Sequence, residues 1–382
     1  MKIKIVLSRA RNFAVSVIVA GFFCISYLSS DRQLHAYNPK FALSNETSID
    51  HVIIDTTMMN NEYCVGYNFL EATESFREDG LEPVTLAVHG TAEMMEMIEN
   101  KPENWDGPIS FGLFIDFHSR QILDYVAKVY SCDEEFQKKV TVHFAFRLSP
   151  FQTSCPQIKV SPSTLECGEF LSNRKKFRRA VGDSFQLYPS NLMRNIARKG
   201  AKSDIHFIVD GDMIMSDGFA EKIKPIANQI VDGKNKNVLV VRRFETNETT
   251  IPHNHIELKN AIENKQVFQF HHRFFFAGHK ISNISHWFAV SNETDEITAW
   301  EIPYSSSLWE VQVILHRNDL YNADYFPARI KVMQSLVYSL CRANYTFNLL
   351  SHVFNVHKGI KLGDTNFSKS VIAHSKRNGR NR

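Results

Sequence analysis

Short apolar runs alternate with helical segments along this chain, and this order limits the fold more than any other feature of the sequence. Apolar runs predict strands, and segments with apolar residues on one face predict the helices between them. The expected order is strand 84–88, helix 91–100, strand 109–115, helix 119–131, strand 140–146, helix 189–200 and strand 205–209. Strands joined through helices pair in parallel, so we expect an α/β domain with a mostly parallel central sheet.

The composition supports a folded body with a sizeable core. The chain has 382 residues, of which 43% are hydrophobic and 22% charged, so disordered and coiled-coil architectures are excluded. The net charge of +3 comes from basic residues near the two ends, Lys2, Lys4, Arg9, Arg11, Lys376, Arg377, Arg380 and Arg382. The body between them is mildly acidic, whereas a nucleic-acid-binding protein carries positive charge on its folded surface. We therefore expect no nucleic-acid partner.

An uncharged run, Phe13–Leu28, follows the first basic cluster. A basic flank before an apolar stretch is the positive-inside pattern of a signal-anchor. We therefore expect residues 1–12 to form a cytosolic tail and residues 13–30 a transmembrane signal-anchor. The alternative is a cleaved signal peptide, for which Ser26–Ser30 offers a poor cleavage site. In either case the rest of the chain enters the secretory pathway.

The rest of the chain carries the marks of that pathway. Acceptor sites for N-glycans, Asn-x-Ser/Thr, occur at Asn45, Asn247, Asn283, Asn292, Asn344 and Asn366. Five cysteines follow the apolar run, in a compartment where disulfides form. Cys155 and Cys167 would close a short loop in a Pro- and Ser-rich stretch, so we expect them to pair. Because five is odd, at least one thiol has no partner within the chain.

Three regions follow the anchor. Residues 31–82 show little periodicity and indicate a stem or an N-terminal extension. The alternating pattern begins at residue 83, and we expect the main domain to cover residues 83–365. Residues 366–382 are predicted to be a basic C-terminal tail.

The strand at 205–209 ends in the most informative residues of the chain, the Asp-Gly-Asp at 210–212. Residues i and i+2 of a strand point to the same side, so Asp210 and Asp212 converge. Two convergent carboxylates at the carboxyl edge of an α/β sheet bind a divalent cation, or a ligand through it. The alternative is a solvated acidic turn. A strand, an Asp-x-Asp at its tip and a helix after it make up the nucleotide-sugar metal site of GT-A glycosyltransferases.

Four segments in register resemble glycosyltransferase family 49, the family of β-1,3-N-acetylglucosaminyltransferase and β-1,4-glucuronyltransferase enzymes and of the second catalytic domain of LARGE-type glycosyltransferases. They lie within residues 83–362: Trp105–Ser110, Tyr188–Ala197 with the following Asp-Gly-Asp-Met, Trp309-Glu310 with Arg317, Asp324 and Phe326 downstream, and Phe354–Gly359. The sequence departs from the family on the acceptor side. The family's Trp-Glu-Pro is Trp-Glu-Val here, Arg329–Met333 replaces a Gly-Phe-Asn-Lys/Arg segment, and a cysteine pair is missing around Phe274–Gly278.

The resemblance implies a GT-A type nucleotide-sugar-binding fold and a set of site residues. Asp210, Asp212 and His357 would bind Mn²⁺, because mixed carboxylate and imidazole ligands favour that ion over Mg²⁺. The donor, a UDP-sugar, would be bound by Asn191, Arg194, Asn195, Asp210 and Lys358. For Arg194 an exposed helix arginine is the alternative. Glu310 is the candidate general base, with Asp319 and Asp324 as alternatives.

The resemblance also implies a reaction and a location. We expect an inverting transferase of the Golgi membrane, single-pass type II, that moves GlcNAc or GlcA from UDP to a glycan acceptor in β-linkage. Overall likeness favours GlcNAc slightly, and association with itself or with other Golgi glycosyltransferases is a further expectation. The alternative is a non-catalytic lumenal protein on the same fold that binds a glycan or stabilises a partner.

Overall fold

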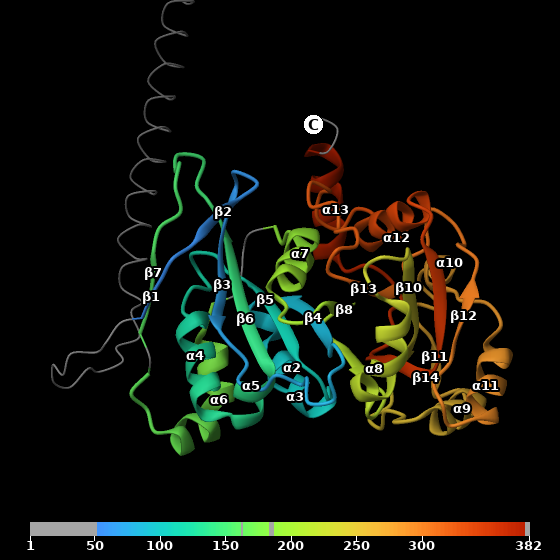
Figure 1. The fold of residues 1–382 in the computed structure, drawn as a ribbon. Coiled ribbons are helices and arrows are strands. Elements are labelled where there is room, and N and C mark those ends of the chain that lie inside the picture. The colour runs from blue at the N-terminus through green and yellow to red at the C-terminus, as the bar shows by residue number, and fades with distance from the viewer. Residues whose placement is uncertain (1–51, 162, 183–186, 379–382) are drawn as a thin grey trace, which may run out of the picture. The chain divides into compact units, whose positions relative to one another are not determined.

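The computed structural model describes residues 52–161, 163–182 and 187–378 (Figure 1). The expected tail and anchor at 1–30 and the sequon at Asn45 lie outside the described residues. Within the described ranges, no helix combines the length and apolar character that crossing a bilayer requires.

Most strands of the described ranges belong to one 12-stranded sheet, with the order β12-β14-β10-β13-β8-β4-β5-β6-β3-β2, while β11 pairs with β10 and β9 with β14. A separate two-stranded sheet joins β1 and β7. The strand bounds are β1 (Val52–Ile54), β2 (Thr57–Met59), β3 (Tyr63–Leu70), β4 (Val84–Gly90), β5 (Ile109–Phe114), β6 (Val140–Arg147), β7 (Ile158–Val160), β8 (Ile205–Ile208), β9 (Met213–Met215), β10 (Asn237–Thr246), β11 (Val267–Gln269), β12 (Ala299–Ile302), β13 (Gln312–His316) and β14 (Thr346–Lys358).

Helices connect these strands, and several are short. Their bounds in the described ranges are η1 (Ala92–Met94, a 3₁₀ helix), α2 (Met95–Glu99), α3 (Lys101–Asn104), α4 (Ile122–Cys132), α5 (Glu134–Lys139), α6 (Cys167–Ala180), α7 (Ser190–Gly200), α8 (Phe219–Ile230), α9 (His255–Glu263), α10 (Phe276–His279), α11 (Ile284–Glu293), α12 (Val332–Arg342) and α13 (Asn366–Asn378). The helix α13 occupies most of the segment that was expected to be a basic tail.

The α/β prediction is confirmed, but the sheet is mixed rather than mostly parallel. One parallel part is β8-β4-β5-β6, the four strands that the sequence pattern predicts, and β10 with β14 forms another. On one side β3 joins β6 antiparallel, and on the other β13 lies antiparallel between β8 and β10. The sequence-based expectation considered only strands that are linked through helices. The flanking strands β3 and β13 are outside that pattern, and they pair antiparallel with their neighbours.

Side chains of β5 alternate between two layers of helices. Ile109, Phe111 and Leu113 belong to the main core with residues of α4 and α8. Gly112 faces α7 on the other side, where a Cβ atom would lie 3.0 Å from the Met193 carbonyl oxygen. The missing side chain therefore lets α7 pack closely on the sheet, and α7 leads directly into β8.

The described part of the predicted stem belongs to the fold. The strand β3 pairs with β6, and Gly66 leaves room for the Phe144 ring, which would lie 2.4 Å from a Cβ there. Cys64 of β3 is fully buried. The folded domain thus includes residues before 83, and the weak periodicity of this segment reflects its position at the border of a large sheet.

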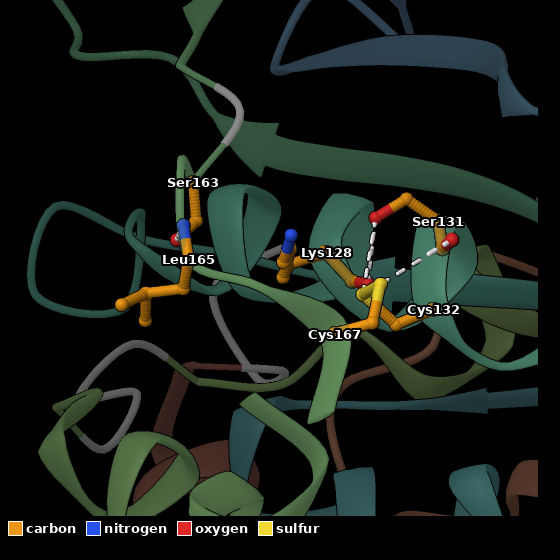
Figure 2. Close-up of a disulfide and its surroundings, with 6 residues drawn as sticks. All are labelled: Lys128, Ser131, Cys132, Ser163, Leu165 and Cys167. Atoms are coloured by element: carbon orange, nitrogen blue, oxygen red, sulfur yellow. Dashed lines mark hydrogen bonds between the residues drawn. A yellow bond between two sulfur atoms is a disulfide. The ribbon is translucent and has the colours of Figure 1, made fainter. Parts of the chain in front are cut away.

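The predicted Cys155–Cys167 disulfide is wrong. Cys155 pairs with Cys64 across a Cα–Cα distance of 5.6 Å, and Cys132 pairs with Cys167 across 5.2 Å. Figure 2 shows the second bond, which joins the end of α4 to the start of α6. Loop length suggested the wrong partner because helix packing and the β1–β7 pairing, rather than nearness in sequence, bring the thiols together. Cys341 is the free cysteine of the described ranges.

Candidate active site

A short strand brings the Asp-x-Asp turn against the end of β14. The strand β9 follows Asp212 directly and pairs antiparallel with β14, with Met213 opposite His357. As a result the Asp212 Oδ2 atom lies 3.2 Å from the His357 Nε2 atom. Two segments far apart in sequence thus present a carboxylate and an imidazole to the same point, as the family resemblance implied.

The orientation of His357 is fixed by the turn that follows it. Its Nδ1 atom lies 2.7 Å from the Gly359 carbonyl oxygen and donates a hydrogen to it, because a carbonyl can only accept. In the neutral ring the Nε2 lone pair therefore faces Asp212. Burial would lower the pKa of His357, but the hydrogen bond and charge of Asp212 outweigh this and raise it.

Asp210 has different partners from Asp212. Its Oδ1 atom accepts a hydrogen bond of 2.7 Å from Arg194 Nη2, and its Oδ2 atom lies 3.6 Å from Arg243 Nη1. Burial would raise the pKa of Asp210, but the charges of Arg194 and then Arg243 hold it well below its ordinary value. Both arginine side chains are nearly buried, at 8% and 6% exposed, while 39% of the Asp210 side chain is exposed.

Of the three predicted metal ligands, the structure brings Asp212 and His357 together and pairs Asp210 with arginines. No group of three His, Cys, Asp or Glu side chains within the described ranges has the geometry to hold a metal ion. The chemistry of Asp212 and His357 fits Mn²⁺, because a carboxylate oxygen and an imidazole lone pair meet with the tautomer already set. Asp210 does not fit as a ligand in its observed pairing, since two guanidinium groups hold its oxygens.

Two of the residues predicted to bind the donor have structural partners instead. Asn195 donates to the Asn322 carbonyl and accepts from the Asn322 backbone N–H, at 2.8 and 2.9 Å. Asn191 donates to the Ala323 carbonyl at 2.9 Å. Both side chains are buried, so they anchor the loop after β13 to α7. Of the three residues, only Arg194 reaches Asp210.

The candidate bases differ sharply in their surroundings. Burial raises the pKa of Glu310, and its backbone carbonyl accepts a hydrogen bond of 2.7 Å from Arg243, which places this residue beside the candidate site. Asp319 is buried and accepts hydrogen bonds from the His316 backbone N–H and the Tyr345 hydroxyl. Those two bonds give Asp319 a structural role.

Asp324 and Lys358 were also predicted to take part in the site, and the structure gives each of them other surroundings. Asp324 accepts a hydrogen bond of 3.0 Å from the Asn60 side chain. Lys358 ends β14 and is exposed, opposite Thr246 of β10.

Sequence reasoning missed several buried polar groups around Asp210. Arg243 lies on β10, and the pKa of His89, at the end of β4, is lowered to about 3 by burial and by the Arg194 charge. His89 Nδ1 is hydrogen-bonded to the Tyr188 hydroxyl at 2.5 Å. Within the described part of the chain, His89 Nε2 and Arg194 Nη1 are buried without a hydrogen-bonding partner. The available signal was a charged or polar residue inside an apolar strand, which is buried only when it has partners.

The sequons in the described ranges stand at the surface. Asn247, Asn283, Asn292, Asn344 and Asn366 are all exposed. Their side chains are therefore accessible for attachment of glycans, and their glycosylation stays a prediction.

A family model described as "Glycosyl-transferase for dystroglycan" matches residues 83–382. This chain belongs to glycosyltransferase family 49. Among curated proteins it is similar to β-1,4-glucuronyltransferase 1 of Bos taurus, with 26% identity over 302 residues, which cover 73% of this chain and 68% of that protein. It is also similar to the xylosyl- and glucuronyltransferase LARGE2s of Danio rerio, with 24% identity over 223 residues, or 57% of this chain. The match spans about a quarter of that relative's length, 24%.

Solved structures give weaker likenesses. A crystal structure of S. aureus TarS residues 1–349 has 15% sequence identity and a TM-score of 0.34, covering 71% of this chain and 60% of that one. A structure of GalNAc-T7 with UDP, GalNAc and Mn²⁺ has 8% identity and a TM-score of 0.41, covering 78% and 48%.

Proposed function

We propose that this family 49 member is an inverting, metal-dependent glycosyltransferase of GT-A type that uses a UDP-sugar and extends a glycan in β-linkage. The observation that carries the proposal is the contact of Asp212 with His357 at the tip of the β8–β9 turn. A carboxylate and an oriented imidazole at the edge of an α/β sheet are suited to a cation that bridges a diphosphate.

The ligand set supports Mn²⁺ as the cofactor. Asp212 and His357 would hold the ion, because a carboxylate and an imidazole together favour Mn²⁺. When bound there, Mn²⁺ supplies Lewis-acid neutralisation of the negative charge on the departing diphosphate. Arg194 pairs with Asp210, and its Nη1 group is buried without a hydrogen-bonding partner among the described residues. This free N–H group is suited to bind an anionic part of the donor.

We further propose glucuronic acid rather than GlcNAc as the transferred sugar. Of the two curated relatives named above, one is a glucuronyltransferase by name and the other a xylosyl- and glucuronyltransferase. Beside Asp210 the nearly buried Arg194 has a buried N–H group without a hydrogen-bonding partner among the described residues, and a sugar carboxylate is a ligand that arginine binds well. GlcNAc offers no charge for this group to bind.

The chemical step needs a base on the acceptor side. In a single displacement, the acceptor hydroxyl oxygen bonds to the anomeric carbon, the bond from that carbon to the phosphate oxygen breaks, and UDP leaves. Glu310 would take the hydroxyl proton. Burial raises the pKa of Glu310, which makes its carboxylate a better proton acceptor when ionised.

Release of UDP tests the function. Purified full-length protein is incubated with Mn²⁺ and, in separate reactions, UDP-GlcA, UDP-GlcNAc, UDP-xylose and UDP-glucose, each with a mixed-oligosaccharide acceptor. We expect turnover with UDP-GlcA that stops with a chelator and returns with Mn²⁺. Turnover with UDP-GlcNAc alone would reverse the donor assignment. Absence of UDP binding and turnover with every donor would favour the non-catalytic alternative.

For location we propose the Golgi membrane, with residues 13–30 as a retained anchor and the described domain in the lumen. The six sequons and the basic flank of the apolar run support this topology. Carbonate extraction should leave the protein in the membrane fraction, with glycans that a glycosidase removes. Recovery of unglycosylated protein in the cytosol would contradict it.

A further inference from the structure

Two neighbouring arginines of β10 have unlike surroundings although both are buried in the same strand. Successive residues of a strand point to opposite faces. Arg242 donates to the carbonyl oxygens of Ile281 and Ser282, at 2.9 and 2.6 Å, and so holds the chain before α11. Arg243 points to the other face, toward Asp210.

The Arg243 guanidinium contacts four residues from separate parts of the chain. Its Nη1 atom lies 3.6 Å from Asp210 Oδ2, after β8. Its Nη2 atom donates to the Glu310 carbonyl oxygen at 2.7 Å, just before β13. The same Nη2 atom lies 2.5 Å from His279 Nδ1 at the end of α10. The guanidinium carbon lies 4.3 Å from the centre of the Phe270 ring, which covers one face of the group.

His279 Nδ1 faces both the Arg243 guanidinium, at 2.5 Å, and the Glu310 carbonyl oxygen, at 3.1 Å. Arginine can only donate, so His279 Nδ1 must accept from Arg243, and the ring hydrogen then sits on Nε2. That Nε2–H points to His271 Nδ1, 3.0 Å away. Burial, followed by the Arg243 charge, lowers the pKa of His271 to about 3 and that of His279 to about 2, so both rings are neutral. With this tautomer the hydrogen bonds run in one direction, from Arg243 through His279 to His271.

We propose that Arg243 is a positioning residue of the transfer reaction, which fixes the Asp210 carboxylate and the Glu310 segment relative to each other. The role rests on the proposed function, in which Asp210 lies on the donor side and Glu310 on the acceptor side. An in-line displacement requires the two sides to be held within a fraction of an ångström, and a misplacement of about 1 Å costs about 100-fold in rate. One planar group with several fixed donors does this, whereas a lysine ammonium cannot match the same geometry.

The test compares the same substitution at the two neighbouring arginines in the full-length protein. For Arg243→Lys we expect kcat with UDP-GlcA to fall about 100-fold, while the Kd for UDP with Mn²⁺, measured by calorimetry, changes less than about threefold. Arg242→Lys is the matched control. It should lower the melting temperature but leave kcat per folded molecule unchanged, because its partners are backbone carbonyls away from Asp210.

A second variant guards against misfolding. His279→Gln keeps a hydrogen-bond acceptor for Arg243, and we expect it to lose less kcat than Arg243→Lys with the same unchanged Kd for UDP. If Arg243→Lys turns over as fast as Arg242→Lys, or if its loss lies entirely in UDP binding, the positioning role is wrong while the proposed function stands. A wild-type protein that binds no UDP and turns over no donor would remove the proposed function and this role together.

Discussion

The two halves of the central sheet were assembled by different kinds of contact. In the first half, β8-β4-β5-β6, neighbouring strands pair in parallel, and helices follow β4 and β5 while α7 precedes β8, so nearby sequence builds it. In the second half, β13 lies antiparallel to β10, while β10 and β14 pair in parallel with a register shift between Val240 and Arg242. Figure 1 shows the first half in blue to green and the second in yellow to red.

The candidate site uses one set of groups from each half. The first half supplies Asp210 and Asp212, at the tip of β8. The second half supplies His357, Arg243 and Glu310 from β14, β10 and the segment before β13. A pair of carboxylates can follow a strand in any α/β sheet. Here the chemistry of the pair depends on the histidine, arginine and glutamate that the second half places beside it. We therefore expect substitutions in the shared site to remove activity and those that support only one half to remove stability.

The largest effect is expected at Asp212. Asp212→Asn removes the negative charge that fits a cation beside His357, so transfer should fall by roughly 1,000-fold and lose its response to Mn²⁺. The fold should change little, because this ion pair is partly exposed. Initial rates at several Mn²⁺ concentrations, together with thermal melting, measure both expectations.

Asp217→Asn is the matched control for Asp212→Asn. Asp217 also pairs with a histidine, His253, at 2.8 Å, but both side chains are more than half exposed and lie outside the site. The control should keep full activity. If Asp212→Asn kept Mn²⁺-dependent turnover, the cation would have to be held elsewhere.

Glu310 should give the next largest effect. Glu310→Gln keeps the shape and removes the proton acceptor, so kcat should fall by about 100-fold or more, with little change in donor binding. Asp319→Asn provides the comparison, because Asp319 bonds to the His316 N–H and the Tyr345 hydroxyl. We expect that variant to lose stability and keep the kcat of its folded fraction. The opposite pattern in the two variants would move the base to Asp319.

The difference between the halves also decides how much the sequence could predict. Strands β4, β5, β6 and β8 were predictable because apolar runs and helices alternate locally, and the Asp-x-Asp follows one of them. The nearness of His357 to Asp212 came only from the family resemblance, since it depends on the β9–β14 register. The Cys64–Cys155 bond was missed for the same reason, because it depends on where β3 and the chain before β7 lie.

Arg243 shows what an unaided reading of the sequence omits. Its neighbours in Val-Val-Arg-Arg-Phe predict a buried strand, and two arginines in such a run must both find partners. The pattern does not say that one partner set is structural, at Ile281 and Ser282, and the other lies at Asp210. Only the register of β10 against its neighbours makes that distinction.

A smaller effect is expected at Arg194, which we propose binds the donor. Arg194→Lys keeps a charge near Asp210 but loses the unpartnered buried N–H group, so KM for UDP-GlcA should rise about tenfold. The preference for UDP-GlcA over UDP-glucose should fall with it if the guanidinium binds the sugar carboxylate. A rise in KM that is equal for both donors would instead assign Arg194 to the diphosphate. An unchanged KM for both would leave it with a structural role only.

The smallest effect on catalysis is expected at Asn195, the residue that follows Arg194 in α7. Asn195 is buried and bonds to both backbone groups of Asn322, at 2.8 and 2.9 Å, so Asn195→Ala leaves a buried carbonyl and N–H unpaired. We expect a loss of about 1–3 kcal/mol in the free energy of unfolding for each group left unpaired, seen in denaturant titration. The folded fraction should keep kcat and the KM for UDP-GlcA, because Asn195 holds the loop after β13 rather than the donor.

If Asn195→Ala raised KM as Arg194→Lys does while unfolding at an unchanged denaturant concentration, the original assignment of Asn195 to the donor would be restored. The division of α7 into one catalytic side chain and several structural ones would then be wrong.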